Sequence, residues 1–247
     1  MPKFFVTSSQ IEDKKIKIIN EDVKHIKNVL RKQIGEKIEI CNKNTEKNYI
    51  AEIEKLEQEQ IICKIIEEIE AKAESNVYLH IFQGIPKAEK MDLIIQKGVE
   101  LGVSEFTPVE MKRCVVKLDD KNSLKKITRW QKISEVASKQ SGRDTIPQVN
   151  NPISIEEMCK KINEYDVFFI AYEKEEKNYI KKELKNIEEK DSIKIGILIG
   201  PEGGIEKEEV LRLEQAGGKV ISLGKRILRT ETVALQVASI IMYELEK

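Results

Sequence analysis

The sequence predicts a protein of two units: a small β-barrel with one inserted helix over residues 1–72, and an α/β unit with a parallel sheet over residues 73–247. Short runs of β-branched and apolar residues fill the first stretch, with the alternation of half-buried strands. From Asn76 onward, strand patterns alternate with helical patterns, which favours a parallel sheet covered by helices. A length of 247 residues suits one large and one small domain.

In the first unit, one helix interrupts the strand patterns. A helix is expected over residues 22–33, with Ile26, Val29 and Leu30 on one face and Gly35 beyond its end. The acidic and lysine-rich stretch 65–75 is expected to connect the two units. The strands of this unit are expected at residues 4–6, 16–19, 38–40, 49–53 and 61–66.

In the second unit, the same patterns predict helices at residues 91–99, at residues 123–140, and in a segment that ends at residues 217–218. Gly102 would end the first of these helices. Trp130 in the second of these is expected in the core. The strands are expected at residues 77–82, 106–109, 167–171, 193–199 and 219–223.

The last helix, expected over residues 230–245, is apolar around most of its circumference. Such a helix is buried on nearly all sides, either in the core of its own chain or against another subunit. We therefore expect a homodimer.

Composition excludes several classes of protein. No run of about 18 apolar residues exists to span a bilayer, and the N-terminus lacks a secretory signal pattern, so a soluble cytoplasmic protein is expected. The 4 cysteines lie far apart and there are 2 histidines, a spacing that fits neither a disulfide framework nor a metal site. Scarce imidazole also argues against serine or cysteine nucleophile chemistry.

Charge is balanced overall but unevenly distributed. Residues 14–37 hold eight Lys or Arg against three acids, and residues 112–143 hold ten against three. Residues 219–229 add four basic residues and no acid. Each run alone is typical of a solvated helix face, but three such runs in a neutral chain favour a surface that holds phosphates.

Two glycine turns follow apolar strands. The strand ending at Ile199 runs into residues 200–204 (GPEGG), and the strand ending at Leu223 runs into residues 224–232 (GKRILRTET). Parallel sheets bind ligands at the carboxyl ends of their strands, and glycine lets the backbone approach a ligand. The spacing fits neither a P-loop nor a dinucleotide fingerprint. Two such turns at neighbouring strand ends would enclose one pocket; the alternative is a pair of tight structural turns.

These turns carry a family resemblance. Residues 198–204 (LIGPEGG) followed by 222–232 (SLGKRILRTET) resemble the C-terminal signature of the trefoil-knot (SPOUT) methyltransferases. More specifically, the chain resembles the family that methylates N3 of a uridine in bacterial 16S ribosomal RNA. Further stretches that match this family in order are 29–31 (VLR), 90–103 (KMDLIIQKGVELGV) and 137–143 (ASKQSGR).

The resemblance implies a PUA-like β-barrel over residues 1–72 that binds RNA. It also implies a knotted α/β domain over residues 73–247 that binds S-adenosylmethionine, no metal, and a homodimer formed through the knot. The substrate would be 16S ribosomal RNA or the assembled small ribosomal subunit. The residues implied to bind the cofactor are Leu198, Ile199, Gly200, Gly203, Gly204, Leu223, Gly224, Ile227 and Leu228.

Methylation of N3 requires a base, because N3 of uridine carries a proton. Glu231 is the expected base, although an acid in the first turn of a helix also stabilises the helix dipole. Arg229 and Arg226 are expected to stabilise negative charge on the uracil oxygens. Lys3, Arg31 and Arg143 are expected RNA contacts. Two alternatives stay open: a trefoil-knot enzyme that acts on transfer RNA or a ribose hydroxyl, and a non-catalytic RNA-binding assembly factor.

Overall fold

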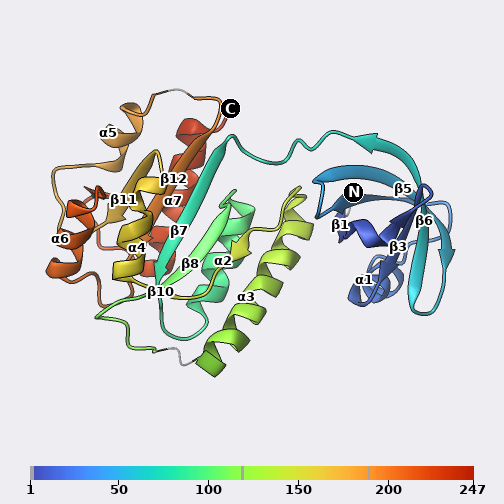
Figure 1. Ribbon diagram of the computed structural model, residues 1–247, viewed down its shortest axis with the longest axis horizontal. Helices are drawn as coiled ribbons and strands as arrows, with labels where there is room; N and C mark the ends of the chain where they lie inside the picture. The colour runs from blue at the N-terminus through green and yellow to red at the C-terminus, as the bar shows by residue number, and fades with distance from the viewer. Residues whose placement is uncertain (1–2, 118–119, 189) are drawn as a thin grey trace. The chain divides into compact units, whose positions relative to one another are not determined.

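A computed structural model of the chain describes residues 3–117, 120–188 and 190–247 and divides into two compact units (Figure 1). The first unit contains Met1–Glu74 and also Ser138–Ile146, and the second contains Ser75–Ala137 and Pro147–Lys247. The sequence had indicated a single boundary near residue 72. Residues 138–146 belong with the first unit because Asp144 binds Lys3 and Asn48 there.

The first unit is built on a six-stranded sheet with the order β1-β4-β5-β6-β3-β2. Strands β1 and β4 are parallel and the other pairs are antiparallel. Apolar side chains that alternate along the strands, such as Ile16, Ile18, Ile38 and Ile40, form its core. Its strands are β1 (Lys3–Val6), β2 (Ile11–Glu12), β3 (Lys15–Ile19), β4 (Lys37–Asn42), β5 (Lys47–Leu56) and β6 (Gln60–Ile69).

The helical part of the first unit is shorter than predicted. Helix α1 (Glu21–Lys24) continues as the π-helical segment η2 (His25–Val29), and a short 3-10 turn, η1 (Ser8–Gln10), precedes β2. The predicted helix over residues 22–33 ends early because Arg31 has a left-handed backbone, with a φ of 51°.

The second unit is built on a seven-stranded sheet in which every pair of strands is parallel. The order is β10-β8-β7-β12-β11-β13, and β9 pairs with β8. Its strands are β7 (Val77–Gly84), β8 (Glu105–Glu110), β9 (Gln148–Val149), β10 (Ile153–Ser154), β11 (Val167–Ala171), β12 (Ile193–Ile199) and β13 (Lys219–Ile221).

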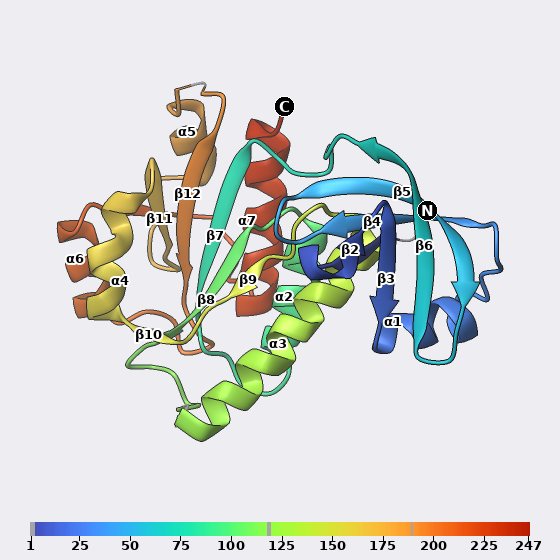
Figure 2. The ribbon, with the colours of Figure 1, turned by 45° about the vertical axis from the view of Figure 1, so that its right-hand side comes forward.

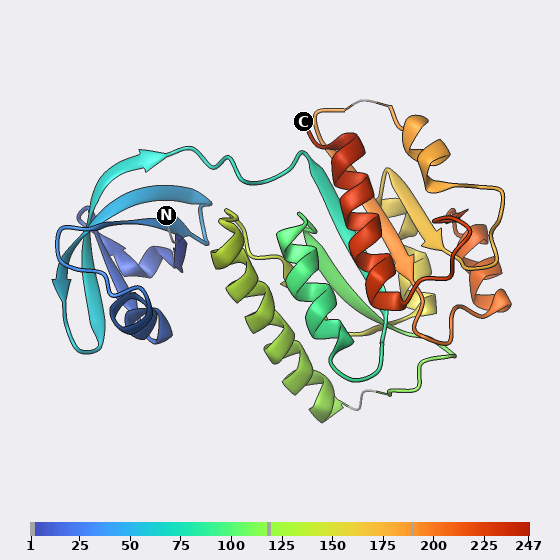
Figure 3. The same cartoon turned by 180° about the vertical axis from the view of Figure 1, so that it is seen from behind.

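Helices cover both faces of this sheet. Helices α2 (Lys90–Glu100), α3 (Asp120–Ser141), α5 (Ile180–Lys185) and α7 (Thr230–Leu245) contribute to the apolar cluster on one face (Figure 3). Helices α4 (Ile155–Lys161) and α6 (Lys207–Gln215), with the turn η3 (Ile162–Glu164), cover the other face (Figure 2). Buried Trp130 confirms the expected core position, and its indole N–H donates to Asp92 at 3.1 Å.

The loop after β11 returns to hold the segment after β13. The backbone N–H of Tyr172 donates to the carbonyl of Ile221, and the N–H of Ser222 donates to the carbonyl of Asn178. The N–H of Ile180 donates in turn to the carbonyl of Ser222. These bonds join the loops that follow β11 and β13 at the carboxyl edge of the sheet. Among the residues that the structure describes, no helix has both the length and the apolar character needed to cross a membrane.

Candidate active site

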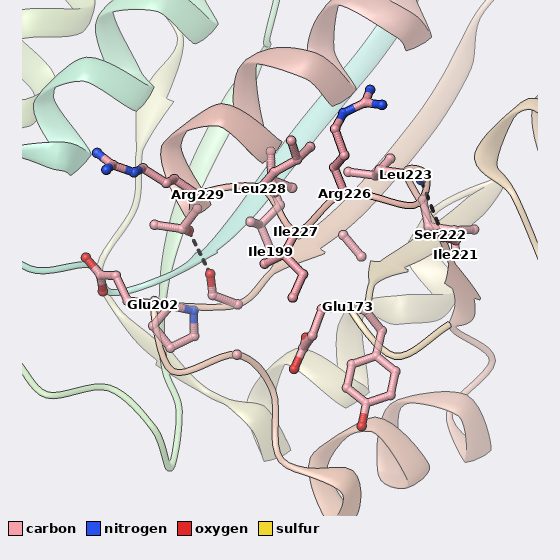
Figure 4. A pocket seen from close by; sticks show the side chains of 18 of the residues that line it. Glu173, Ile199, Glu202, Ile221, Ser222, Leu223, Arg226, Ile227, Leu228 and Arg229 are labelled. Carbon is pink, nitrogen blue, oxygen red and sulfur yellow. Dashed lines mark hydrogen bonds between the residues drawn. The ribbon is translucent and has the colours of Figure 1, made fainter. Parts of the chain in front are cut away.

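A cavity of about 520 Å³ opens at this edge of the sheet (Figure 4). Its size is in the range of small-molecule sites. Residues 171–173, 199–204 and 221–230 line it, together with Lys90 and Val233. The two glycine turns that the sequence singled out therefore surround one cavity, but the strands that precede them are not neighbours as expected, because β11 lies between β12 and β13 in the sheet.

The first glycine turn presents backbone rather than side chains to the cavity. Gly204 has a φ of 72°, and a Cβ atom there would lie 2.5 Å from Oε1 of Glu173. The guanidinium of Arg113 donates to the carbonyl of Gly203 at 2.8 Å and holds the turn from outside. This cradle suits a ligand that contacts backbone groups closely. The carboxylate of Glu173 also lines the cavity, and its negative charge suits the positively charged groups of S-adenosylmethionine, so the lining fits that molecule.

A buried polar network joins the two turns. The hydroxyl of Thr230 donates to the carbonyl of Gly200 at 2.7 Å and accepts from the side-chain amide of Gln83 at 2.8 Å. Gln83 lies at the end of β7, is fully buried, and also donates to the carbonyl of Gly84. Sequence reasoning missed Gln83; the available signal was an amide side chain directly after an apolar strand.

Three charged side chains meet beside the cavity. Nζ of Lys90 lies 2.9 Å from Oε1 of Glu202 and 3.3 Å from Oε2 of Glu231. The hydrogen bond that Lys90 donates to Glu202 is the main cause that raises the pKa of Lys90. Burial acts to raise the pKa of Glu202, but hydrogen bonds from Lys90 and the backbone N–H of Lys87 hold it below its usual value. Both groups are therefore charged at neutral pH.

Most of the residues that the resemblance implies as cofactor ligands line the cavity. Leu198 is the exception: alternation along β12 turns it away from the cavity into the apolar cluster under α4 and α6. The residues from that set that line the cavity are Ile199, Gly200, Gly203, Gly204, Leu223, Gly224, Ile227 and Leu228.

Of the three residues expected to act on the target uridine, two line the cavity and one does not. Arg226 and Arg229 line the cavity and are exposed. Glu231 is not among the lining residues, but its Oε2 lies 3.3 Å from Nζ of Lys90, which does line the cavity. Sequence reasoning missed Lys90 as part of this group.

Two of the three expected RNA contacts are buried in ion pairs within the first unit. Lys3 is 4% exposed and pairs with Asp144 and Glu39, and Arg143 is 6% exposed and pairs with Glu74. A buried cation with carboxylate partners does not present its charge to a phosphate, so these two expectations are corrected. Arg31 is exposed, as an RNA contact requires.

The comparisons with known proteins agree with this arrangement. Residues 73–242 match an RNA methyltransferase domain, and residues 18–66 match an RNA methyltransferase PUA domain. A PUA-like unit followed by a parallel α/β unit with a glycine-lined cavity at its carboxyl edge defines the class of SPOUT RNA methyltransferases.

Individual relatives narrow this class. The ribosomal RNA small subunit methyltransferase E of Bacillus subtilis is 35% identical over 253 residues, which cover 100% of this chain and 98% of that protein. The chain belongs to the ribosomal RNA small subunit methyltransferase E family.

Two solved structures have the same fold over their whole length. The Neisseria gonorrhoeae member of this family, solved bound to S-adenosyl methionine, is 31% identical with a TM-score of 0.86, covering 100% of this chain and 98% of that one. A protein from Legionella pneumophila, solved in complex with the bound cofactor SAM, is 28% identical with a TM-score of 0.87, covering 99% and 98%.

Proposed function

We propose that this protein transfers a methyl group from S-adenosylmethionine to N3 of a uridine in 16S ribosomal RNA. One observation carries the proposal: two glycine turns surround one cavity at the carboxyl edge of the sheet, and Lys90 and Glu202 of the charged triad line it. The family supplies the RNA class, since its curated members are named as small-subunit ribosomal RNA methyltransferases. The proposal places the protein with ribosomal RNA in the cytoplasm.

The cofactor would lie between the turns 199–204 and 223–228, and when bound it supplies an electrophilic methyl group. The chain's own residues then align the base and exclude water, and alignment alone contributes several powers of ten to such reactions. The pairing edge of uridine must face the cavity, so the target is an unpaired or flipped nucleotide.

Glu231 is the proposed acceptor of the N3 proton, and Arg226 and Arg229 are proposed to stabilise charge on the uracil oxygens. In the part of the chain that the structure describes, neither arginine has a carboxylate partner, so both are free to bind an anionic ligand. Figure 4 shows them on one rim of the cavity, with Glu173 on the facing side. Arg31 is the proposed RNA contact of the PUA-like unit.

The decisive experiment combines the protein, labelled S-adenosylmethionine, and either 16S ribosomal RNA or assembled small subunits, and then maps the methylated atom. Label on N3 of one uridine is expected. Label on a ribose oxygen or on transfer RNA would favour a different trefoil-knot activity. If calorimetric titration with S-adenosylmethionine showed no binding, the result would instead favour a non-catalytic assembly factor.

The proposed base has its own test. Glu231→Gln should lower single-turnover methylation by at least about a hundredfold, in the range that general bases contribute, without loss of cofactor binding. Glu202→Gln is the comparison, because Glu202 also belongs to the triad and lines the cavity. A larger loss in Glu202→Gln than in Glu231→Gln would assign the base to Glu202.

A homodimer is part of the proposal. Helix α7 buries one face in its own chain, through residues such as Ala234, Val237 and Ile241, whereas Tyr243 remains 87% exposed. Ile227, at the mouth of the cavity, is 86% exposed. Exposed large apolar side chains of this kind mark protein interfaces. Sedimentation analysis should give twice the mass of the 28.5 kDa chain.

A further inference from the structure

Lys90 connects three segments that are far apart in the sequence. It is the first residue of α2, whereas Glu202 lies in the turn after β12 and Glu231 lies in the first turn of α7. Its ammonium group is within ion-pair distance of both carboxylates. The side chains of Lys90, Glu202 and Glu231 are only 30%, 27% and 14% exposed, so solvent screens this triad less than a surface ion pair.

Oε2 of Glu231 is buried and accepts no hydrogen bond among the described residues, although Nζ of Lys90 lies 3.3 Å away. A buried carboxylate oxygen without a hydrogen bond is costly unless a nearby cation compensates it. Lys90 is that cation. Its second partner, Glu202, adds a second negative charge close to Glu231.

The other charged groups around the triad are engaged elsewhere or point to solvent. Glu89 and Asp92, on the same helix as Lys90, pair with Arg129 of α3. Arg229 precedes Glu231 at the start of α7 and is exposed. Within the described chain, no ion pair joins Arg229 to Glu202 or Glu231.

We propose that Lys90 is a positioning residue for methyl transfer, which holds Glu202 and Glu231 together as charged carboxylates at the edge of the cavity. The inference rests on the proposed function, because it assigns Lys90 to the proton-accepting group of that reaction. Without the ammonium group, two partly buried carboxylates would face each other, and each would favour the protonated form of the other. A protonated carboxyl group cannot accept the N3 proton.

The expected consequence is a change in pH dependence. Lys90→Met and Lys90→Gln remove the charge, Lys90→Arg keeps it, and Lys97→Met is the matched control on the same helix. Lys97 pairs only with Glu100 in the described structure and does not line the cavity. Single-turnover methylation would be measured for each variant from pH 5 to pH 8, with cofactor affinity followed by calorimetry.

In the variants without charge, the loss of rate at low pH should begin at a higher pH than in the native protein, so that the ratio of the rate at pH 5 to the rate at pH 8 falls below the native ratio. Affinity for S-adenosylmethionine should stay within about threefold of the native value. Lys90→Arg should restore the native profile and Lys97→Met should leave it unchanged. Carboxyl carbon NMR should show a higher titration midpoint for Glu202 in Lys90→Gln, because Lys90 holds the pKa of Glu202 down in the native protein.

Two outcomes would overturn the proposal. A rate lowered by the same factor at every pH would show a purely structural role for Lys90, and lost cofactor binding would make Lys90 a cofactor ligand. The NMR titration separates this inference from the proposed function. The native protein could methylate no ribosomal RNA while the titration midpoint of Glu202 still rises in Lys90→Gln. In that case the proposed function is wrong, but the role of Lys90 in the triad is confirmed.

Discussion

Thr230 is the first residue of α7, and its hydroxyl group links three parts of the site. It donates to Gly200 in the first glycine turn and accepts from Gln83 at the end of β7. It also lines the cavity. The side chain of Thr230 therefore fixes the distance between the glycine turn after β12 and the start of α7.

Replacement of Thr230 by valine keeps the shape of the side chain and removes both hydrogen bonds. We expect Thr230→Val to lower the free energy of unfolding by about 1–3 kcal/mol, because the amide of Gln83 and the carbonyl of Gly200 lose a partner in a buried place. Urea unfolding measures this change. Thr230→Ser keeps the hydroxyl and should lose less than half as much; equal losses for both variants would contradict a role for the hydrogen bonds.

Asp144 explains why Lys3 is no RNA contact. Its carboxylate accepts hydrogen bonds from Lys3, Asn48 and the backbone N–H of Ala73. Burial acts to raise the pKa of Asp144, but these bonds, that from Lys3 first, hold it below the ordinary value. The same pair raises the pKa of Lys3 although burial opposes it.

Asp144→Asn should be strongly destabilising. It leaves Lys3 as a buried cation with Glu39 as its remaining carboxylate partner, and removal of one partner from a buried pair costs about 3–5 kcal/mol. Chemical unfolding followed by a probe in the first unit tests this. The double variant Asp144→Asn with Lys3→Met should recover part of the loss, and no recovery would show that the charge of Lys3 is not the cause.

At the scale of the element, strand β12 is apolar except for Lys194 and contains one glycine. A Cβ atom at Gly196 would lie 2.4 Å from Cδ2 of Phe168 on the neighbouring strand β11. The aromatic ring therefore occupies the space that a side chain would need. Strand β12 leads directly into the first glycine turn, so its packing also sets the position of the cavity wall.

Gly196→Ala should destabilise the protein by about 1–3 kcal/mol, because overpacking a dense core forces side chains out of their preferred rotamers. Thermal unfolding with and without S-adenosylmethionine would measure the loss. A second change, Phe168→Leu, makes room for the new methyl group, and the double variant should be more stable than the sum of the single effects predicts. Strict additivity would contradict the steric explanation.

The elements that the sequence predicted best are those with strong local patterns. Strands β11 and β12 and helix α7 have the predicted bounds, because continuous apolar runs and a long apolar helix leave little ambiguity. Helices α4 and α5, of 7 and 6 residues, were not predicted, since a segment this short shows less than two helical turns of periodicity.

At the scale of the whole molecule, stability should depend on pH through one buried histidine. His80 is 3% exposed; Nδ1 lies 2.6 Å from the hydroxyl of Tyr165 and Nε2 lies 2.8 Å from that of Thr107. Burial lowers the pKa of His80 from 6.5 to about 4, although Glu105 opposes the shift. His80 is therefore neutral at pH 7, and its 3.4 Å contact with Glu105 is not an ion pair at that pH.

Because the folded-state pKa lies below the unfolded value, His80 contributes its stability above pH 6.5 and loses it as the pH falls to about 4. The loss from this group should be about 3 kcal/mol over that window, at about 1.4 kcal/mol per pKa unit. Urea unfolding at several pH values, compared with His80→Gln, isolates this contribution from that of the carboxylates. Parallel curves for the two proteins would contradict it.

The sequence by itself determined most of the longer strands and helices of both units and the two glycine turns that line the cavity, because apolar periodicity and glycine act locally along the chain. Only the tertiary structure decided which charged and apolar side chains reach a site. Lys3 and Arg143 are buried, Leu198 faces the opposite side of the sheet, and Lys90 lines the cavity and contacts Glu231. Each of these placements depends on partners that lie far away in the sequence, and local sequence patterns cannot predict such contacts.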